Sequence, residues 1–85
     1  MTRDEVTEKI VDIFLQRFEI QGPGLDEDLN EAYEFDSIDA IELLREIEIM
    51  LGSELSRDEK KQAMDIRTIN QITDYILGLA SARAA

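Results

Sequence analysis

The 85-residue sequence contains no cysteine, no histidine and no tryptophan. Without cysteine or histidine it can form neither a disulfide framework nor a Cys/His metal site. It also lacks the imidazole that most enzymes place beside a nucleophile as the general base. These absences count against an independent catalyst, and we predict that the protein is not an enzyme.

Long apolar runs are missing as well. No segment approaches the roughly 20 apolar residues that a membrane-spanning helix needs. The polar start, Met1 to Glu5, has no apolar signal region. We therefore expect a cytoplasmic protein without a transmembrane segment. Apolar residues form 44% of the chain, which is enough for the core of one domain over residues 1–85.

Positive charge is scarce, with 9 basic residues against 20 acidic ones and a net charge of −11. Such a surface repels nucleic acid, so we expect none among the partners and expect basic proteins instead. Ten of the acids fall between residues 26 and 48, where the one base is Arg45. A field this dense can steer partners of opposite charge, although it is also typical of a solvated face.

Four helix-start signals divide the chain. Thr2, Ser56 and Thr68 each begin a capping box, in which the hydroxyl accepts a backbone N–H three residues on and the acid or amide there reaches back. Asp36 is a fourth N-cap. Apolar residues recur at helical spacing behind these caps. We expect helices over about residues 3–18, 37–51, 57–64 and 69–80, followed by frayed residues 81–85.

No segment alternates apolar and polar residues over the length of a strand. The sequence therefore predicts an all-α fold, a small four-helix bundle with three main helices and a short third helix. A long loop joins the first two helices, because the Gly-Pro-Gly sequence at residues 22–24 ends the first. Leu25, Leu29 and Phe35 are expected to anchor this loop, with one helical turn around residues 28–33.

One loop segment resembles the start of a calcium-binding loop, Asp26-x-Asp28-x-Asn30. The turn position that needs glycine is Glu31, and the twelfth position that needs a bidentate glutamate is Ser37. We predict no metal site.

The most informative segment is Asp-Ser-Ile-Asp-Ala-Ile-Glu-Leu-Leu, residues 36–44. Asp36 caps the second helix, so Ser37 falls in its first turn with the hydroxyl pointing outward. A helix N-terminus attracts anions through its free N–H groups and its dipole, so a phosphodiester on Ser37 would lie in that field. From spacing alone, it is the better interpretation that Ser37 is an ordinary polar residue of a first turn and not an attachment site.

This segment resembles the phosphopantetheine attachment motif of acyl carrier proteins. That motif reads Asp-Ser-Leu, then an acid, then an apolar–Glu–Leu group, and it matches Asp36, Ser37, Ile38, Asp39 and residues 41–43. The resemblance covers nearly the whole chain, because the order of helices and the long acidic loop also fit. The ending, Thr-Ile-x-x-Ile-x-Asp-Tyr-Ile at residues 68–76, is similar to the family's last helix.

The resemblance implies a monomeric carrier that works with other enzymes. A phosphopantetheinyl transferase would move 4'-phosphopantetheine from coenzyme A onto Ser37 Oγ. The arm would hold acyl groups as thioesters for acyl-activating and chain-processing enzymes of fatty acid, lipid or polyketide-type biosynthesis. In the family the bundle can shelter the acyl chain in a cleft between its helices. The residues expected to line that cleft here are Ile41, Leu44, Ile47 and Ile72. The alternative is that these residues only pack in the core.

By the same resemblance, partner enzymes bind the second helix with basic patches. The residues expected there are Ile38, Asp39, Glu42, Arg45, Glu46, Glu48 and Ile49. Arg45 stands where the family usually has an apolar residue, Ile49 and Met50 stand where it has acids, and Glu34 replaces a frequent glycine. These departures indicate a specialised carrier with its own partners. The alternative is that Ile49 and Met50 pack on the loop or the third helix.

Two other functions stay open at this point. The motif does not distinguish an acyl load from the aminoacyl load of a peptidyl or D-alanyl carrier. An acidic helical protein-interaction adaptor without a prosthetic group would leave Ser37 unmodified.

Overall fold

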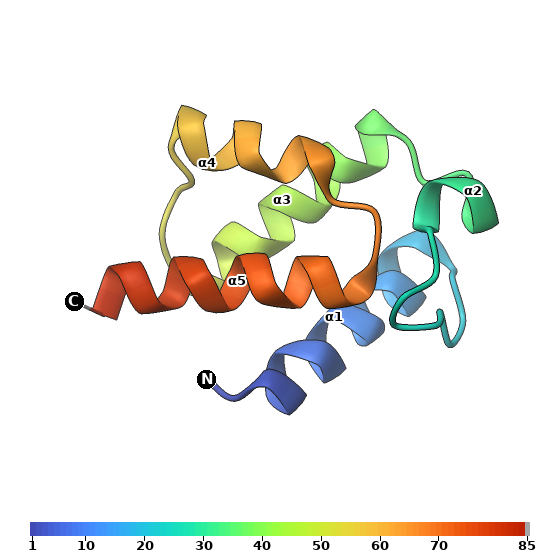
Figure 1. Ribbon diagram of the computed structural model, residues 1–85, viewed down its shortest axis with the longest axis horizontal. Coiled ribbons are helices and arrows are strands. Elements are labelled where there is room, and N and C mark those ends of the chain that lie inside the picture. Colours follow the sequence, from blue (N-terminus) through green and yellow to red (C-terminus); the bar gives the residue numbers. More distant parts are fainter. Residues whose placement is uncertain (85) are drawn as a thin grey trace.

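The computed structural model describes residues 1–84, which form helices and, within that range, no strand (Figure 1). The all-α prediction is confirmed. None of the described helices is long and apolar enough to cross a membrane. The elements are α1 (Arg3–Phe18), α2 (Leu29–Tyr33), α3 (Ser37–Leu51), α4 (Arg57–Gln62), the 3-10 helix η1 (Ala63–Asp65) and α5 (Ile69–Ala84).

The helix starts follow the sequence signals closely. Thr2 Oγ1 accepts the backbone N–H of Glu5 at 3.2 Å, and Thr68 Oγ1 accepts that of Gln71 at 3.1 Å. Ser56 begins α4 in the same way. Each hydroxyl satisfies a backbone donor that the first turn of a helix leaves without a partner. The predicted bounds of α1 and α3 are therefore confirmed, and the predicted turn at residues 28–33 is α2.

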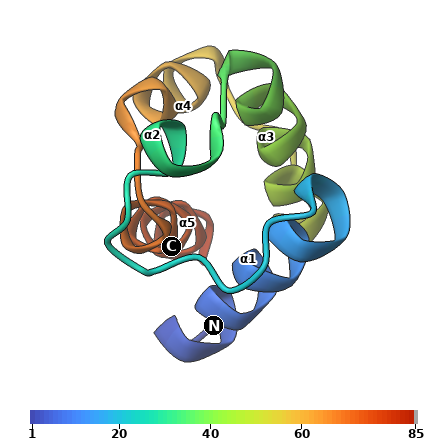
Figure 2. The same ribbon diagram turned by 90° about the vertical axis from the view of Figure 1, so that its right-hand side faces the viewer.

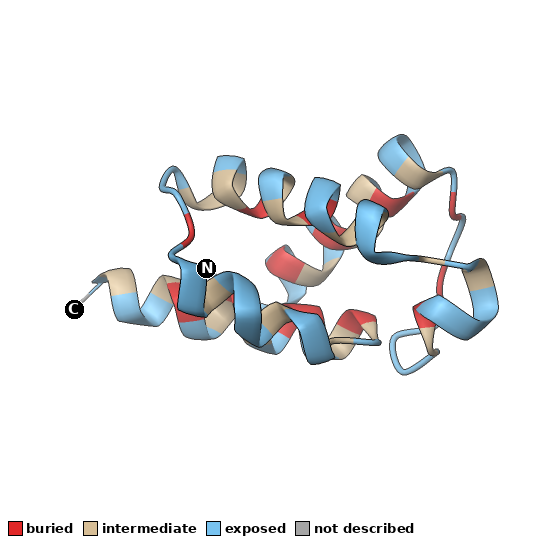
Figure 3. Ribbon diagram, turned by 90° about the horizontal axis from the view of Figure 1, so that it is seen from above, coloured by how far each residue is buried: buried red, intermediate tan, exposed pale blue. Residues whose placement is uncertain are grey.

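The helices surround one apolar core. Seen along the long axis, α1, α3, α4 and α5 lie around the centre, with α2 closing one end (Figure 2). Figure 3 colours the buried positions, which recur along α1, α3 and α5. The most deeply buried apolar side chains are Val6, Ile10, Phe14, Leu29, Ile47, Ile69, Ile72 and Ile76.

Backbone hydrogen bonds fasten the long loop to the bundle. Leu29 is buried, as expected, and its N–H donates to the carbonyl of Arg67 at 2.8 Å. Phe35 is half-buried against Phe14, with ring centroids 5.2 Å apart. The prediction for Leu25 is wrong, because its side chain is 44% exposed and only its carbonyl is engaged, by a backbone N–H of α5. Ile20 is the buried anchor that the sequence reasoning missed.

The end of α5 also differs from the prediction. The helix continues to Ala84 instead of ending near residue 80, so residues 81–84 are not frayed, and Ala85 lies outside the described residues. Arg83 is the physical reason. Its Nη2 donates to the Glu54 carbonyl at 3.1 Å and its Nε to Ser53 Oγ at 2.6 Å, which holds the last turn against the segment after α3.

Candidate functional site

Ser37 is the first residue of α3, and Asp36 positions it. Asp36 Oδ1 accepts the N–H groups of Ile38 and Asp39 at 3.0 Å each. Asp39 Oδ2 in turn accepts the N–H of Asp36 at 3.2 Å, so the cap is a reciprocal box that the sequence reasoning did not foresee. Ser37 is exposed, and its Oγ forms no hydrogen bond with any residue in the range 1–84.

Of the other three serines, Ser81 lies in the last turns of α5 and not at a helix start, and the hydroxyls of the other two are occupied. Ser53 Oγ accepts from Arg83 Nε, and Ser56 Oγ accepts the N–H of Glu59 at 3.1 Å. Ser37 therefore combines three properties: exposure, a free hydroxyl and a place at the head of a long helix.

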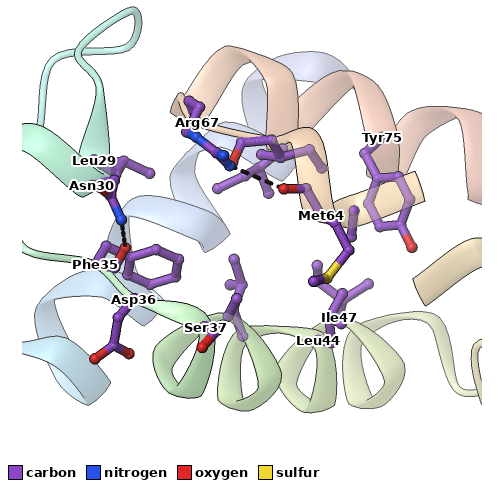
Figure 4. A pocket seen from close by; sticks show the side chains of 15 residues that line it. Leu29, Asn30, Phe35, Asp36, Ser37, Leu44, Ile47, Met64, Arg67 and Tyr75 are labelled. Carbon is purple, nitrogen blue, oxygen red and sulfur yellow. Dashed lines mark hydrogen bonds between the residues drawn. The ribbon is translucent and has the colours of Figure 1, made fainter. Parts of the chain in front are cut away.

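A cavity of about 260 Å³ opens beside Ser37 (Figure 4). Apolar cavities of about 150 Å³ bind a molecule as large as benzene, so this space can hold part of an acyl chain. Its walls come from α2, α3, η1 and α5 and are mostly apolar. The lining residues are Leu29, Asn30, Phe35, Asp36, Ser37, Ala40, Leu43, Leu44, Ile47, Ala63, Met64, Ile66, Arg67, Ile72 and Tyr75.

Three of the four residues expected in an acyl cleft line this cavity: Leu44, Ile47 and Ile72. Ile41 does not, and that expectation is corrected, because its side chain is 63% exposed. Residues of an α-helix advance by about 100° each, which puts Ile41 about 120° around the axis from Ile47. Leu43 and Ala40 take the inward positions instead, and the same helical period could have identified them.

Most of the wall opposite α3 was not assigned from the sequence. Met64 is 63% exposed and lies at the cavity with Ile66. Tyr75 lies one turn after Ile72 on α5, a spacing that could have revealed it. The Tyr75 hydroxyl donates to the Glu59 carbonyl at 2.5 Å, and burial raises the pKa of Tyr75 above its ordinary value.

An ion pair fixes the α4 side of this wall to α5. Arg83 Nη1 and Nη2 donate to the two carboxylate oxygens of Glu59, at 2.9 Å each. These hydrogen bonds, with a further one from the Ser56 backbone, lower the pKa of Glu59 to about 2. The paired oxygens of the carboxylate match the planar fork of the guanidinium, which is the strongest geometry for such a pair.

Three of the acids on α3 are engaged inside the protein. Asp39 completes the cap of its own helix. Glu46 Oε1 lies 3.0 Å from Arg17 Nε on α1, and its side chain is 18% exposed. Glu48 Oε2 accepts the N–H of Leu55 at 2.8 Å and so fastens the segment after the helix. Glu42 alone among the α3 acids after Ser37 is fully in the exposed class.

The outer side of α3 is apolar around one cation. Ile38 and Ile49 are 74% and 73% exposed, and Arg45 is exposed between Ile41 and Ile49 along the helix. Met50 is partly buried against the core. Of the two residues that depart from the family's acids, Met50 packs against the core and Ile49 faces solvent.

Glu34 explains another departure from the family pattern. It ends α2 with φ of +56° and ψ of +34°, in the left-handed region that favours glycine. Its N–H donates to the carbonyl of Asn30 at 3.0 Å, which closes the last turn of α2. The position that the family often gives to glycine therefore has a left-handed backbone conformation here. In this chain a glutamate adopts it, at the cost of backbone strain.

Fold and site together define a class of protein: a small helical carrier domain with a free serine hydroxyl at a helix start beside an apolar cavity. The sequence profile described as "Phosphopantetheine attachment site" matches residues 8–76. An acyl carrier protein of Lactobacillus johnsonii is 32% identical over 78 residues, and one of Lactobacillus acidophilus is 30% identical over 78 residues. Each alignment covers 89% of this chain and 94% of the relative. No solved structure gives a significant match.

The chain belongs to the acyl carrier protein family, whose prosthetic group is 4'-phosphopantetheine. Its residues fit that group, because the free Ser37 hydroxyl can form the phosphodiester and the cavity beside it is open. Acyl carrier proteins carry groups for other enzymes, which agrees with the absence of histidine and cysteine from the sequence.

Proposed function

We propose that Ser37 is the attachment residue for 4'-phosphopantetheine and that the chain carries acyl groups between biosynthetic enzymes. The observation that supports this most strongly is the exposed, unbonded Oγ at the head of α3 beside an apolar cavity. When attached, the arm supplies a thiol that holds an acyl group as a thioester. The Asp36 carboxylate is committed to the helix cap, so the base for attachment comes from the transferase.

The chain's own residues have two tasks in this proposal. Asp36 and Asp39 hold the helix start rigid, so that Ser37 keeps one orientation when the transferase approaches. Leu44, Ile47 and Ile72 offer an apolar lining that shelters the first carbons of an acyl chain from water. Fatty acid, lipid or polyketide-type biosynthesis supplies such cargo.

Partner enzymes dock on α3 in this proposal, since that helix presents Ser37. Each exposed charge pair contributes only about 0.2–1 kcal/mol, so docking is weak and exchange between enzymes is fast. Glu42 is the acid best placed for a basic patch, because the other acids of α3 are engaged within the fold.

The attachment is tested by intact-mass spectrometry after incubation with a phosphopantetheinyl transferase and coenzyme A. Wild type gains the mass of one arm and Ser37→Ala gains none. Ser56→Ala is the matched control, because Ser56 also begins a helix but its hydroxyl is occupied by Glu59. This variant must still be modified. An unmodified wild type would contradict the proposal and favour an adaptor without a prosthetic group.

The load is tested separately on the holo protein. Acyl-activating and aminoacyl-activating enzymes are offered to the same sample, and the mass of the product identifies the cargo. The mostly apolar cavity lining favours an acyl chain. Charging by the aminoacyl enzyme alone would identify a peptidyl or D-alanyl type of carrier.

A further inference from the structure

Apart from Glu42, the outer face of α3 carries no acid, and the rest of the protein does not cover it. We define this outer face by Ile38, Ile41, Arg45 and Ile49. At about 100° per residue, Ile38, Arg45 and Ile49 lie within about 40° of one another, on the side of the helix opposite Ile47. All four residues are exposed, although the chain is strongly charged elsewhere.

Three exposed isoleucines lie along one side of a helix in a protein with 34% charged residues. Exposed apolar side chains scattered singly need no explanation, but an ordered row marks an interaction surface. Burying such area yields roughly 25 cal/mol per Å². The three isoleucines of the outer face therefore favour contact with an apolar surface of a partner.

Arg45 gives this surface its sign of charge. It is exposed in the middle of the row, and within residues 1–84 it forms no ion pair, although the chain has 20 acids and three other arginines are paired. An unpaired guanidinium fits a carboxylate through two parallel hydrogen bonds. A lysine or arginine of a basic patch placed opposite Arg45 would instead be repelled.

Glu42, about 40° from Ile38 and one turn before Arg45, is the one exposed acid of α3 on this side, and the other acids of the helix are engaged within the fold. Asp39 caps its own helix, Glu46 pairs with Arg17, and Glu48 binds a backbone N–H. The uninterrupted acidic field of residues 26–44, which contains no base, therefore ends where Arg45 begins. The surface is polarised along the helix, acidic around Ser37 and apolar with a cation beyond it.

We propose that the outer face of α3 docks into an apolar groove of a partner enzyme that presents a carboxylate opposite Arg45. It discriminates against enzymes whose basic docking patch extends over the second half of the helix. This inference rests on the carrier function proposed above, and charge complementarity to Arg45 identifies the partner's chemistry.

The first test uses a purified housekeeping ketosynthase with a basic docking patch. Every carrier variant is loaded with the same acyl group, and complete loading is verified by intact mass before the assay. Arg45→Glu and Ile49→Glu are each expected to raise kcat/KM about two- to fivefold, the effect of one exposed charge pair. The gain should vanish at high salt, because exposed charges are then screened.

Matched controls carry the same changes on α1, at Lys9 and Leu15, which are both exposed. Lys9→Glu and Leu15→Glu alter the net charge equally but lie outside the outer face, so they should leave kcat/KM unchanged. Circular dichroism should give all four variants the melting temperature of wild type within a few degrees. If the α1 controls gained as much kcat/KM as the α3 variants, the proposal would be overturned, because the gain would then reflect net charge alone.

The second test reverses one charge on the partner enzyme. One basic residue of the ketosynthase patch, facing the second half of the docked helix, is changed to glutamate. Wild type is expected to gain about two- to fivefold in kcat/KM on this enzyme, while Arg45→Glu loses by a similar factor. The inference would be overturned if kcat/KM ranked the carrier variants in the same order on both enzymes. It would also be overturned if wild type and the housekeeping carrier had equal kcat/KM on the unaltered ketosynthase. Since loading is verified first, neither outcome depends on whether Ser37 accepts the arm.

Discussion

Three isoleucines of α3 have different surroundings, which gives a sharp test of how this helix is oriented. Ile47 is 1% exposed and lines both the core and the cavity, whereas Ile41 and Ile49 face solvent. Replacing a buried isoleucine by alanine removes its transfer free energy and leaves a cavity, at a cost of about 2–5 kcal/mol. For a chain of this length the whole free energy of unfolding is about 4–13 kcal/mol. Ile47→Ala is therefore expected to remove a large part of it.

At the two exposed positions, the same substitution should hardly change the stability. Ile41→Ala and Ile49→Ala are expected to change the free energy of unfolding by no more than about 0.5 kcal/mol. The intrinsic helix preference of alanine offsets part of any loss. In thermal unfolding followed by circular dichroism, Ile47→Ala should lower the melting temperature by at least about 8 °C and the other two by only a few degrees. Equal losses at all three positions would refute the orientation of α3 and the assignment of its outer face.

The remaining predictions concern the caps and the ion pair. Asp36→Ala removes the acceptor of two N–H groups, so urea denaturation should show a loss of about 0.5–2 kcal/mol, with Asp36→Asn largely restoring it. Glu34→Gly removes the strain of a left-handed non-glycine residue, about 1–2 kcal/mol, and adds the entropy cost of glycine, about 0.5–1 kcal/mol, so the variant should be more stable by up to about 1.5 kcal/mol in the same assay. Because the pKa of Glu59 falls to about 2 in the folded state, its contribution is present above its ordinary pKa and is lost as the pH falls toward 2. Arg83→Gln should therefore melt below wild type at pH 6, and the difference should shrink by pH 2; a gap that is independent of pH would contradict this assignment.

The main helices were predictable because their signals are local. Capping boxes at Thr2, Ser56 and Thr68 depend on side chains three residues apart, and the structure forms all three. The length of α5 was not predictable in this way. Arg83 holds the last turn through contacts with residues about 30 positions away, and no local pattern reports them.

The residues of the candidate site were also predictable only where they depend on local signals. Ser37 and its cap could be read from the order of residues, since both depend on one turn of helix. The cavity depends on how α2, η1 and α5 meet α3, so Met64 and Tyr75 were missed. Ile41 was misplaced because it shares a three-residue spacing with Leu44, although the helical period puts it about 120° around the axis from the buried Ile47.

The Ser37 hydroxyl is expected to accept the arm, and peptide mapping of the loaded protein tests this attachment directly. Trypsin cleavage after Arg17 and Arg45 releases residues 18–45, a peptide with a single serine and no threonine. After treatment with a phosphopantetheinyl transferase and coenzyme A, this peptide is expected to carry the added mass on Ser37, and the peptides containing the other serines are expected to stay unmodified. An arm found on any other peptide, or none anywhere with a transferase that loads a control carrier, would contradict Ser37 as the attachment residue.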